Sequence, residues 1–268
     1  MGKIVVAVAA LFIPSVIYGQ IAPPNAAGVR FAHVHLYVSN LSLHRSLWSE
    51  LLGGELLEEA GYTALSIPGA LIFFTEQAPT APSAGTAVNH VGFKVQDLDA
   101  VLSKWRTLGY AVDSGSTGGE GLRHAYITMP NGARVELTGD PALTTPSEMH
   151  HVHYHSPRHR EVLAWYRDIF SAVPRVRAAI ETTADVPGSN LTFTRSDGTV
   201  LPTRGTAVDH VGFEVEDIEA FAEMLGSKGV ELEGPPFYVE SLDLWVAFFP
   251  DPNGARVEIT QGLHHFGR

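Results

Sequence analysis

The seven residues NHVGFKV at 89–95 occur a second time as DHVGFEV at 209–215. The match is longer than this heptapeptide, because GTAVNHVGFKVQDLDA at 85–100 aligns without gaps with GTAVDHVGFEVEDIEA at 205–220. Farther along, the hexapeptide NGARVE also occurs twice, at 131–136 and at 253–258. Such self-similarity indicates repeated copies of one structural unit, and it has to be settled before the fold is predicted.

Two weaker copies of the unit alternate with these two. AHVHLYVSN at 32–40 aligns with HHVHYHSPR at 150–158, and a helical pattern follows each stretch. Every copy opens with a short strand, continues with a helix and ends with several strands. In the stronger copies, Asp97 and Asp217 are suitable N-caps for the helix. We therefore expect four βαβββ modules.

Segments rich in turn-forming residues separate the modules. They place the modules at 29–78, 85–142, 149–197 and 205–263. The segment GDPALTTPSE at 139–148 is the expected domain boundary. The prediction is an α+β fold in which consecutive modules pair into two curved mixed-sheet domains, one at 29–142 and one at 149–263.

Composition excludes several functions for this chain of 268 residues. It carries 18 Lys and Arg against 29 Asp and Glu, a net charge of −11. With no cluster of basic residues, a role in nucleic-acid binding has little electrostatic support. Cysteine is absent, which excludes disulfides, thiolate metal sites and cysteine nucleophiles. Any metal must therefore be held by histidine, carboxylate and water.

The N-terminus has the pattern of an export signal at 1–20. Lys3 precedes an apolar run from Ile4 to Tyr18, and Gly19 follows at a plausible cleavage point. The run contains Pro14 and is shorter than the roughly 20 residues of a membrane span. The alternatives are a core strand or an uncleaved anchor. We expect an exported protein, periplasmic or secreted, with no membrane segment after cleavage.

The repeated strand presents a histidine away from the core. Successive residues of a strand face opposite sides, so His90 and Gly92 face one side of the sheet. Val91 and Phe93 face the other side, where the helices should pack. A glycine inside a strand often marks the close approach of a ligand or another backbone. The matching histidines of the other three modules are His33, His151 and His210.

The closing strand supplies a carboxylate in the same way. Glu136 faces away from the core because Val135 and Leu137 alternate with it, and Glu258 repeats the pattern. If consecutive modules pair, the metal-ligand sets are His33, His90 and Glu136 in the first half and His151, His210 and Glu258 in the second. Two imidazoles and one carboxylate suit Fe²⁺ or Mn²⁺, with Zn²⁺ and Ni²⁺ as alternatives. Single histidines often have only structural roles, but the recurrence of all three residue types favours metal binding.

These motifs resemble those of the vicinal oxygen chelate superfamily, which includes glyoxalase I, extradiol ring-cleaving dioxygenases and bleomycin-resistance proteins. The resemblance runs from Phe31 to about Gly262 and rests on the H-V-G-F opening, an aromatic residue late in the helix (Trp48, Tyr166) and the closing G-A-R-V-E-[LI]-T. It implies paired modules that half-enclose a metal held by their first and last strands. The four-module length is similar to that of extradiol dioxygenases, whose working metal lies in the second pair.

The chain departs from both enzyme types. Phe248 stands where the resemblance to dioxygenases implies a tyrosine, although Tyr126 precedes Glu136 in the first half. Phe73 and Thr192 stand where glyoxalase I has a second glutamate. The superfamily resemblance therefore does not carry over either reaction intact.

Three further residues are candidates for acid–base catalysis. His35 and His153 lie two positions after a candidate ligand and on the same predicted face, and Tyr126 is the third candidate. The alternative is that they merely line a wet groove. We expect a metal-dependent enzyme acting on a small-molecule substrate with adjacent oxygens, with a slight preference for dioxygenase-like chemistry. The alternatives are a glyoxalase-type isomerase or lyase and a non-catalytic, antibiotic-type binding protein.

Overall fold

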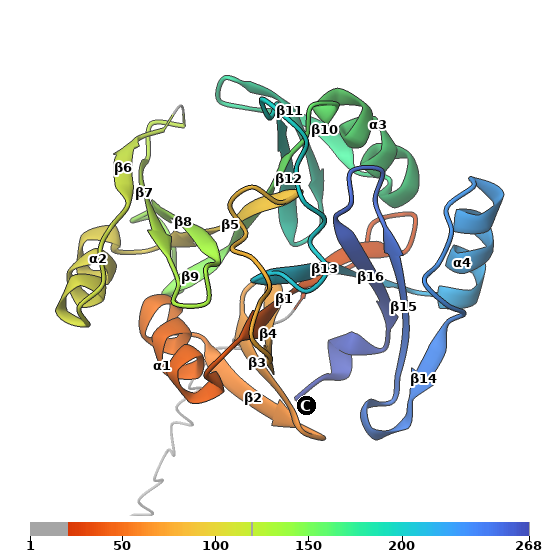
Figure 1. Ribbon diagram of the computed structural model, residues 1–268, viewed down its shortest axis with the longest axis horizontal. Coiled ribbons are helices and arrows are strands. Elements are labelled where there is room, and N and C mark those ends of the chain that lie inside the picture. The colour runs from red at the N-terminus through yellow and green to blue at the C-terminus, as the bar shows by residue number, and fades with distance from the viewer. Residues whose placement is uncertain (1–20, 119, 268) are drawn as a thin grey trace, which may run out of the picture.

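The computed structural model describes residues 21–118 and 120–267, which form four βαβββ modules in succession (Figure 1). This confirms the predicted α+β fold and its repeated unit. The predicted export signal at 1–20 lies outside the described residues. Within the described residues, no helix is long and apolar enough to cross a bilayer.

The modules have closely similar elements. The first comprises β1 (Val29–Val38), α1 (Leu41–Leu52), β2 (Glu55–Glu59), β3 (Tyr62–Ile67) and β4 (Ala70–Glu76). The second comprises β5 (Val88–Val95), α2 (Leu98–Thr107), β6 (Ser114–Thr117), β7 (Arg123–Thr128) and β8 (Arg134–Gly139). The third comprises β9 (Ser147–His155), α3 (His159–Phe170), β10 (Val173–Arg177), β11 (Ile180–Val186) and β12 (Ser189–Thr194). The fourth comprises β13 (Val208–Val215), α4 (Ile218–Ser227), β14 (Phe237–Val239), the 3₁₀ helix η1 (Glu240–Leu242), β15 (Leu244–Pro250) and β16 (Arg256–Gln261), and a second 3₁₀ helix, η2 (Leu263–His265), follows.

Two of the helices begin where the sequence placed them. The carboxylate of Asp97 accepts a hydrogen bond from the backbone N–H of Ala100, and Asp217 accepts one from Ala220. Each bond satisfies a backbone donor that the first turn of a helix leaves without a partner. Both residues are therefore confirmed as N-caps.

The strands form two eight-stranded sheets. The first sheet has the order β14-β15-β16-β13-β1-β4-β3-β2, so it joins the first module to the fourth. The second sheet has the order β10-β11-β12-β9-β5-β8-β7-β6 and joins the second module to the third. In each sheet the opening strands of two modules pair antiparallel at the centre, β1 with β13 and β5 with β9.

The prediction that consecutive modules pair within 29–142 and within 149–263 was therefore wrong. The segment at 139–148, taken as the domain boundary, instead links two modules of one sheet. Sheet pairing uses backbone hydrogen bonds, and the opening strands of all four modules share one alternating pattern. That pattern selects no particular partner, so module order along the chain was a poor guide to pairing.

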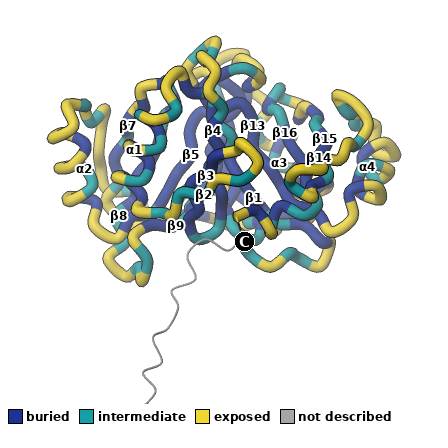
Figure 2. The backbone as a smooth tube through the Cα atoms, turned by 90° about the horizontal axis from the view of Figure 1, so that it is seen from below, coloured by how far each residue is buried: buried dark blue, intermediate teal, exposed yellow. Residues whose placement is uncertain are grey.

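The two sheets share one continuous hydrophobic core. Val91 and Phe93 are fully buried in it, as the strand pattern predicted. Trp48 of the first module lies 5.7 Å from Phe93 of the second, ring centre to ring centre, which joins the two sheets. Figure 2 shows the buried strands in the middle of the molecule, with the exposed outer surfaces of α2 and α4 at its two ends. The opposite, polar faces of the central strands carry the predicted ligands.

Two candidate metal centres

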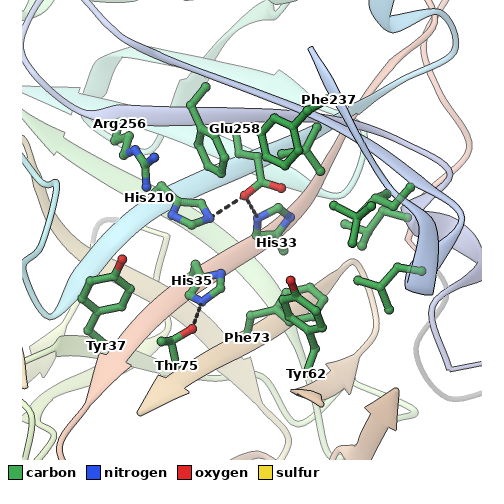
Figure 3. A pocket seen from close by; sticks show the side chains of 16 residues that line it. His33, His35, Tyr37, Tyr62, Phe73, Thr75, His210, Phe237, Arg256 and Glu258 are labelled. Carbon is green, nitrogen blue, oxygen red and sulfur yellow. Dashed lines mark hydrogen bonds and ion pairs between the residues drawn. The ribbon is translucent and has the colours of Figure 1, made fainter. Parts of the chain in front are cut away.

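His33, His210 and Glu258 meet at the middle of the first sheet, in what we call the first centre (Figure 3). Antiparallel pairing places Gly212 opposite His33, and parallel pairing places Glu258 beside Gly212. Glu258 Oε2 lies 2.6 Å from His210 Nε2 and 3.4 Å from His33 Nε2. All three side chains of the centre are buried.

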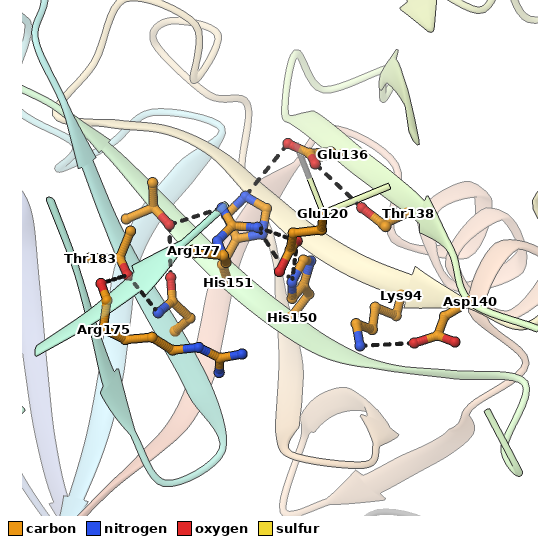
Figure 4. Close-up of polar contacts among 12 residues, drawn as sticks. Lys94, Glu120, Glu136, Thr138, Asp140, His150, His151, Arg175, Arg177 and Thr183 are labelled. Atoms are coloured by element: carbon orange, nitrogen blue, oxygen red, sulfur yellow. Dashed lines mark hydrogen bonds and ion pairs between the residues drawn. The ribbon is translucent and has the colours of Figure 1, made fainter. Parts of the chain in front are cut away.

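His90, His151 and Glu136 meet in the same way in the second sheet and form the second centre. Glu136 Oε2 lies 3.1 Å from His90 Nε2 and 3.6 Å from His151 Nε2. The two Nε2 atoms are 3.3 Å apart. Figure 4 shows Glu136 facing His151 across this centre.

All six predicted ligands therefore lie in the two centres, but the predicted sets were wrong. His33 belongs with His210 and Glu258, whereas His151 belongs with His90 and Glu136. The exchange follows directly from the pairing of β1 with β13 and of β5 with β9, because each centre takes one histidine from each opening strand.

The glycine of the repeated strand makes room for the histidine of the partner module. A Cβ atom on Gly212 would lie 1.9 Å from Cε1 of His33, and a Cβ atom on Gly92 would lie 2.2 Å from Cε1 of His151. The sequence predicted the close approach of a ligand or another backbone at these positions. The group that approaches is instead the imidazole of the histidine on the paired strand.

The donor atoms of the first centre fit a divalent cation. Burial opposes ionisation of Glu258, yet His33 and His210 hold the pKa of its carboxyl well below the usual range. His210 Nε2 lies 2.6 Å from this carboxylate, within ion-pair distance. The Nε2 atoms of His33 and His210 and the carboxylate of Glu258 therefore face one point, as the ligands of a single cation would.

Further histidines complete both groups of donors. His33, His35, His210 and Glu258 each offer a ligand atom within 4.8 Å of the others, and so do His90, His151 and His153. Together with the carboxylates, these groups match the nitrogen and oxygen ligands of Fe²⁺, Mn²⁺ or Zn²⁺ sites.

The residue before each repeated histidine orients the imidazole. His210 Nδ1 donates to Asp209 Oδ2 at 2.6 Å, and His90 Nδ1 is 2.9 Å from Asn89 Oδ1. The strand register skips Asp209 and Asn89, so a bulge turns each of them toward its histidine. Strict alternation therefore missed both residues, although the change from Asn to Asp is visible in the two heptapeptides.

This difference changes the basicity of the two histidines. Burial disfavours the charged form of His210, but Glu258 and Asp209 together raise its pKa. For His90, burial dominates over the attraction of Glu136, and the pKa is lowered. A carboxylate hydrogen-bonded to a ligand histidine fixes its tautomer and makes it a stronger ligand. The first centre alone has this carboxylate.

The candidate acid–base residues lie beside the centres. His35 Nε2 is 2.8 Å from Thr75 Oγ1, and the His35 ring lies 4.5 Å from that of His210. His153 Nε2 is likewise 2.8 Å from Thr194 Oγ1. Burial is the main cause that lowers the pKa of His35 and of His153 well below the usual value. Both line cavities, as expected for residues on that face, and their catalytic role stays a prediction.

Tyr126 lies in the second centre and contacts its carboxylate. Its hydroxyl donates to Glu136 Oε2 at 2.7 Å, and burial together with the charge of Glu136 raises the pKa of Tyr126. Phe248 occupies the matching position of the first centre, where its strand pairs it with Glu258. A polar side chain therefore lies beside the carboxylate of the second centre, and an apolar one lies beside the equivalent carboxylate of the first.

Two cavities open on the centres. The first, of about 210 Å³, contains His33, His210 and Glu258, and its apolar lining includes Phe73, Phe237, Leu244, Val246, Phe248 and Leu263 (Figure 3). The second, of about 170 Å³, contains Glu136 and His153, and its polar lining includes Glu120, His124, Tyr126, Thr138 and Arg177. Arg177 was not singled out in the sequence. The two cavities therefore offer different side chains to any molecule that enters them.

The chain belongs to the Glyoxalase/Bleomycin resistance protein/Dioxygenase superfamily, whose family model matches residues 30–137 and 148–259. Glyoxalase I from Zea mays has a similar structure, with 16% sequence identity, a TM-score of 0.66, and coverage of 88% of this chain and 93% of that chain. A putative dioxygenase from Bacillus subtilis subsp. subtilis str. 168 is similar at 14% identity and a TM-score of 0.65, over 92% of this chain and 88% of that chain. At these identities, the similarity supports the fold alone. No curated protein matches the sequence.

Proposed function

We propose that this protein is an exported, metal-dependent enzyme whose first centre acts on a small substrate with adjacent oxygens. The observation that carries the proposal is the arrangement of His33, His210 and Glu258 around a shared point in an apolar cavity, with Asp209 orienting His210. The expectation of export rests on the residue pattern at 1–20 alone. Fe²⁺ or Mn²⁺ is the preferred ion for this ligand set, ahead of Zn²⁺ or Ni²⁺.

The cavity residues would hold the substrate and move its proton. A divalent ion in this centre would act as a Lewis acid toward the substrate oxygens. His35 is kept neutral by burial, and its ring lies next to that of His210, so it is placed to accept a proton from a substrate hydroxyl. Phe73 and Phe248 offer apolar contacts and exclude water from the reacting oxygens.

A dioxygenase-like reaction is the preferred chemistry. Phe73 cannot provide a fourth ligand, and with His35 acting as a base rather than as a ligand, the protein would leave several coordination positions open. Two histidines and one carboxylate with open positions are the ligand set of many non-haem iron oxygenases. The alternative enzyme is a glyoxalase-type isomerase or lyase. Phe248, which cannot donate a hydrogen bond to a substrate oxygen as a tyrosine would, favours the second alternative, a non-catalytic binding protein.

Metal analysis and oxygen uptake test the proposal. We expect the purified protein to contain a divalent transition metal and to consume oxygen with a catechol. Glu258→Ala should abolish uptake, whereas the matched variant Glu136→Ala should retain it. The opposite result would move the reaction to the second centre. Oxygen-independent turnover of a thiol adduct of a 2-oxoaldehyde would indicate the glyoxalase-type alternative. Absence of metal, with ligand binding unchanged in His210→Ala, would leave only a binding protein.

A further inference from the structure

The second cavity contains a buried arginine, Arg177, whereas the arginine that lines the first cavity, Arg256, is paired with Asp209 and Glu233. Arg177, the last residue of β10, is 7% exposed and lines the cavity. Glu59 holds the same position in the first module, because each residue precedes a two-residue turn and pairs across it, Arg177 with Ile180 and Glu59 with Tyr62. The carboxylate of Glu59 accepts a hydrogen bond from the backbone N–H of Gly267. The two modules therefore place opposite charges at equivalent points.

The guanidinium of Arg177 is incompletely paired. Its Nη2 donates to Thr192 Oγ1 at 3.0 Å, while Nη1 lies 3.3 Å from Glu120 Oε2 and 3.4 Å from His150 Nε2. Its Nε is buried and has no hydrogen-bond partner. Among the described residues, the ion pair with one oxygen of Glu120 is the only one that Arg177 makes (Figure 4). A guanidinium stays ionised in proteins, so its burial calls for more complete pairing than this.

Glu120 is a replaceable partner. Its side chain is 29% exposed, whereas that of Arg177 is 8% exposed. A partly exposed carboxylate can be solvated when it leaves an ion pair, but the buried guanidinium cannot. A second carboxylate entering the cavity would therefore find a cation whose present partner is easily displaced.

The arginine also lies close to the second centre. Arg177, Glu136 and His153 line the same cavity. Arg177 contacts His150, whose ring lies 4.8 Å from that of His151. A small ligand held by Arg177 would therefore lie against this centre.

We propose that the second cavity binds a small ligand bearing a carboxylate, which Arg177 recognises. Planar guanidinium and carboxylate groups match in a two-point hydrogen-bonded fork, which gives geometric specificity as well as strength. The carboxylate displaces Glu120, and the rest of the ligand lies among the polar side chains of Tyr126 and Thr138. The cavity, of about 170 Å³, has room for a ligand of a few carbon atoms or one ring. The proposal concerns the second cavity alone and requires no metal ion.

Titration calorimetry on metal-free protein tests this directly. The probes are glycerate and glycerol, which share adjacent hydroxyls and differ in the carboxylate. We expect glycerate to bind and glycerol not to bind. Arg177→Met should weaken glycerate binding by roughly tenfold or more, since hydrogen bonds to charged groups are among the stronger ones. The control is Arg175→Met on the same strand, which removes an exposed arginine paired with Asp185 and should change nothing.

Two further variants make the test independent of folding defects. Arg177→Lys keeps the charge but loses the planar fork, so it should also weaken glycerate binding. Glu120→Gln removes the competing carboxylate and should strengthen binding. Equal glycerate affinity in the original protein and in Arg177→Lys, or glycerol binding as tight as that of glycerate, would overturn the proposal. Failure of glycerate to bind even to the Glu120→Gln variant would overturn it as well. Because the protein is free of metal, these outcomes do not depend on the function proposed for the first centre.

Discussion

Gly212→Ala should disable the first centre while leaving the second centre intact. The added Cβ atom would lie 1.9 Å from Cε1 of His33, whereas carbon atoms pack at roughly 3.5–4.0 Å. The imidazole must therefore move by roughly 1.5 Å or more, and metal-ligand distances tolerate only about 0.2 Å. His33 would then leave the ligand set. We expect metal affinity to fall by more than the roughly 10–100-fold that loss of a ligand's hydrogen-bonding partner costs.

The same substitution should also destabilise the fold. Overpacking of a filled site costs about 1–3 kcal/mol, because neither β1 nor β13 can move far at the centre of a sheet. Gly226→Ala is the matched control. Gly226 lies in α4, where an added Cβ atom would meet no heavy atom within 4 Å beyond its chain neighbours and the helix's own backbone. Alanine there should therefore be neutral or slightly stabilising.

The assay combines calorimetric metal titration with thermal unfolding. Titrations are made in a Glu136→Ala background, so that the signal comes from the first centre alone. Gly212→Ala should lose the binding signal, and Gly226→Ala should keep it. If Gly212→Ala bound metal with unchanged affinity and melted like the control, the close approach of His33 to this strand would not be part of the centre, and the reasoning would be refuted.

Three further outcomes follow from particular contacts. Asp209→Asn should lower metal affinity at the first centre by roughly 10–100-fold, and the reciprocal Asn89→Asp should raise it at the second, both measured by competition with a chelating dye. If both variants bound metal with the affinity of the original protein, Asp209 would have no part in metal binding. Burial raises the pKa of Asp251 from 3.8 to about 6, so the folded protein binds its proton more tightly and stability falls as pH rises through this window. At about 1.4 kcal/mol per pKa unit, Asp251→Asn should remove a penalty of about 3 kcal/mol above pH 6, visible as a flatter dependence of urea unfolding on pH between 4 and 7; an unchanged slope would contradict this. Tyr126→Phe removes the hydroxyl that donates to Glu136 and should raise the pKa of that carboxyl, which would make metal binding at the second centre more sensitive to acid than in the original protein.

The sequence predicted the module, the faces of its strands and the six candidate ligands that the structure gathers in two centres, because period-two alternation is a local property. His90 and Gly92 share a face whatever strand pairs with theirs. Which strand pairs with which depends on backbone edges that are alike in all four modules. The alternation of residues therefore could not predict which centre contains His33 and which contains His151. The sequence did not predict Asp209 as a site residue for a different reason, since a bulge breaks the alternation at that residue. Arg177 was not predicted because its strand belongs to the weakly repeated part of the module. Its equivalence to Glu59 of the first module appears only when the two hairpins are compared in the structure.

The first module pairs with the fourth and the second with the third, so both centres depend on both halves of the chain. The residues around the two centres nevertheless differ. Each centre takes one histidine from each half of the chain, so neither half can complete a centre by itself, and both must be kept for either to work. The groups around the ligands are free of this constraint. Asp209 and Phe248 give the first centre a more basic histidine beside an apolar ring, whereas Asn89, Tyr126 and Arg177 give the second a less basic histidine beside a phenol and an incompletely paired guanidinium. The candidate metal-ligating residues are therefore the same in both centres, because each centre needs a histidine from each of two paired strands. The residues around them differ, so the two cavities offer different contacts to a bound molecule.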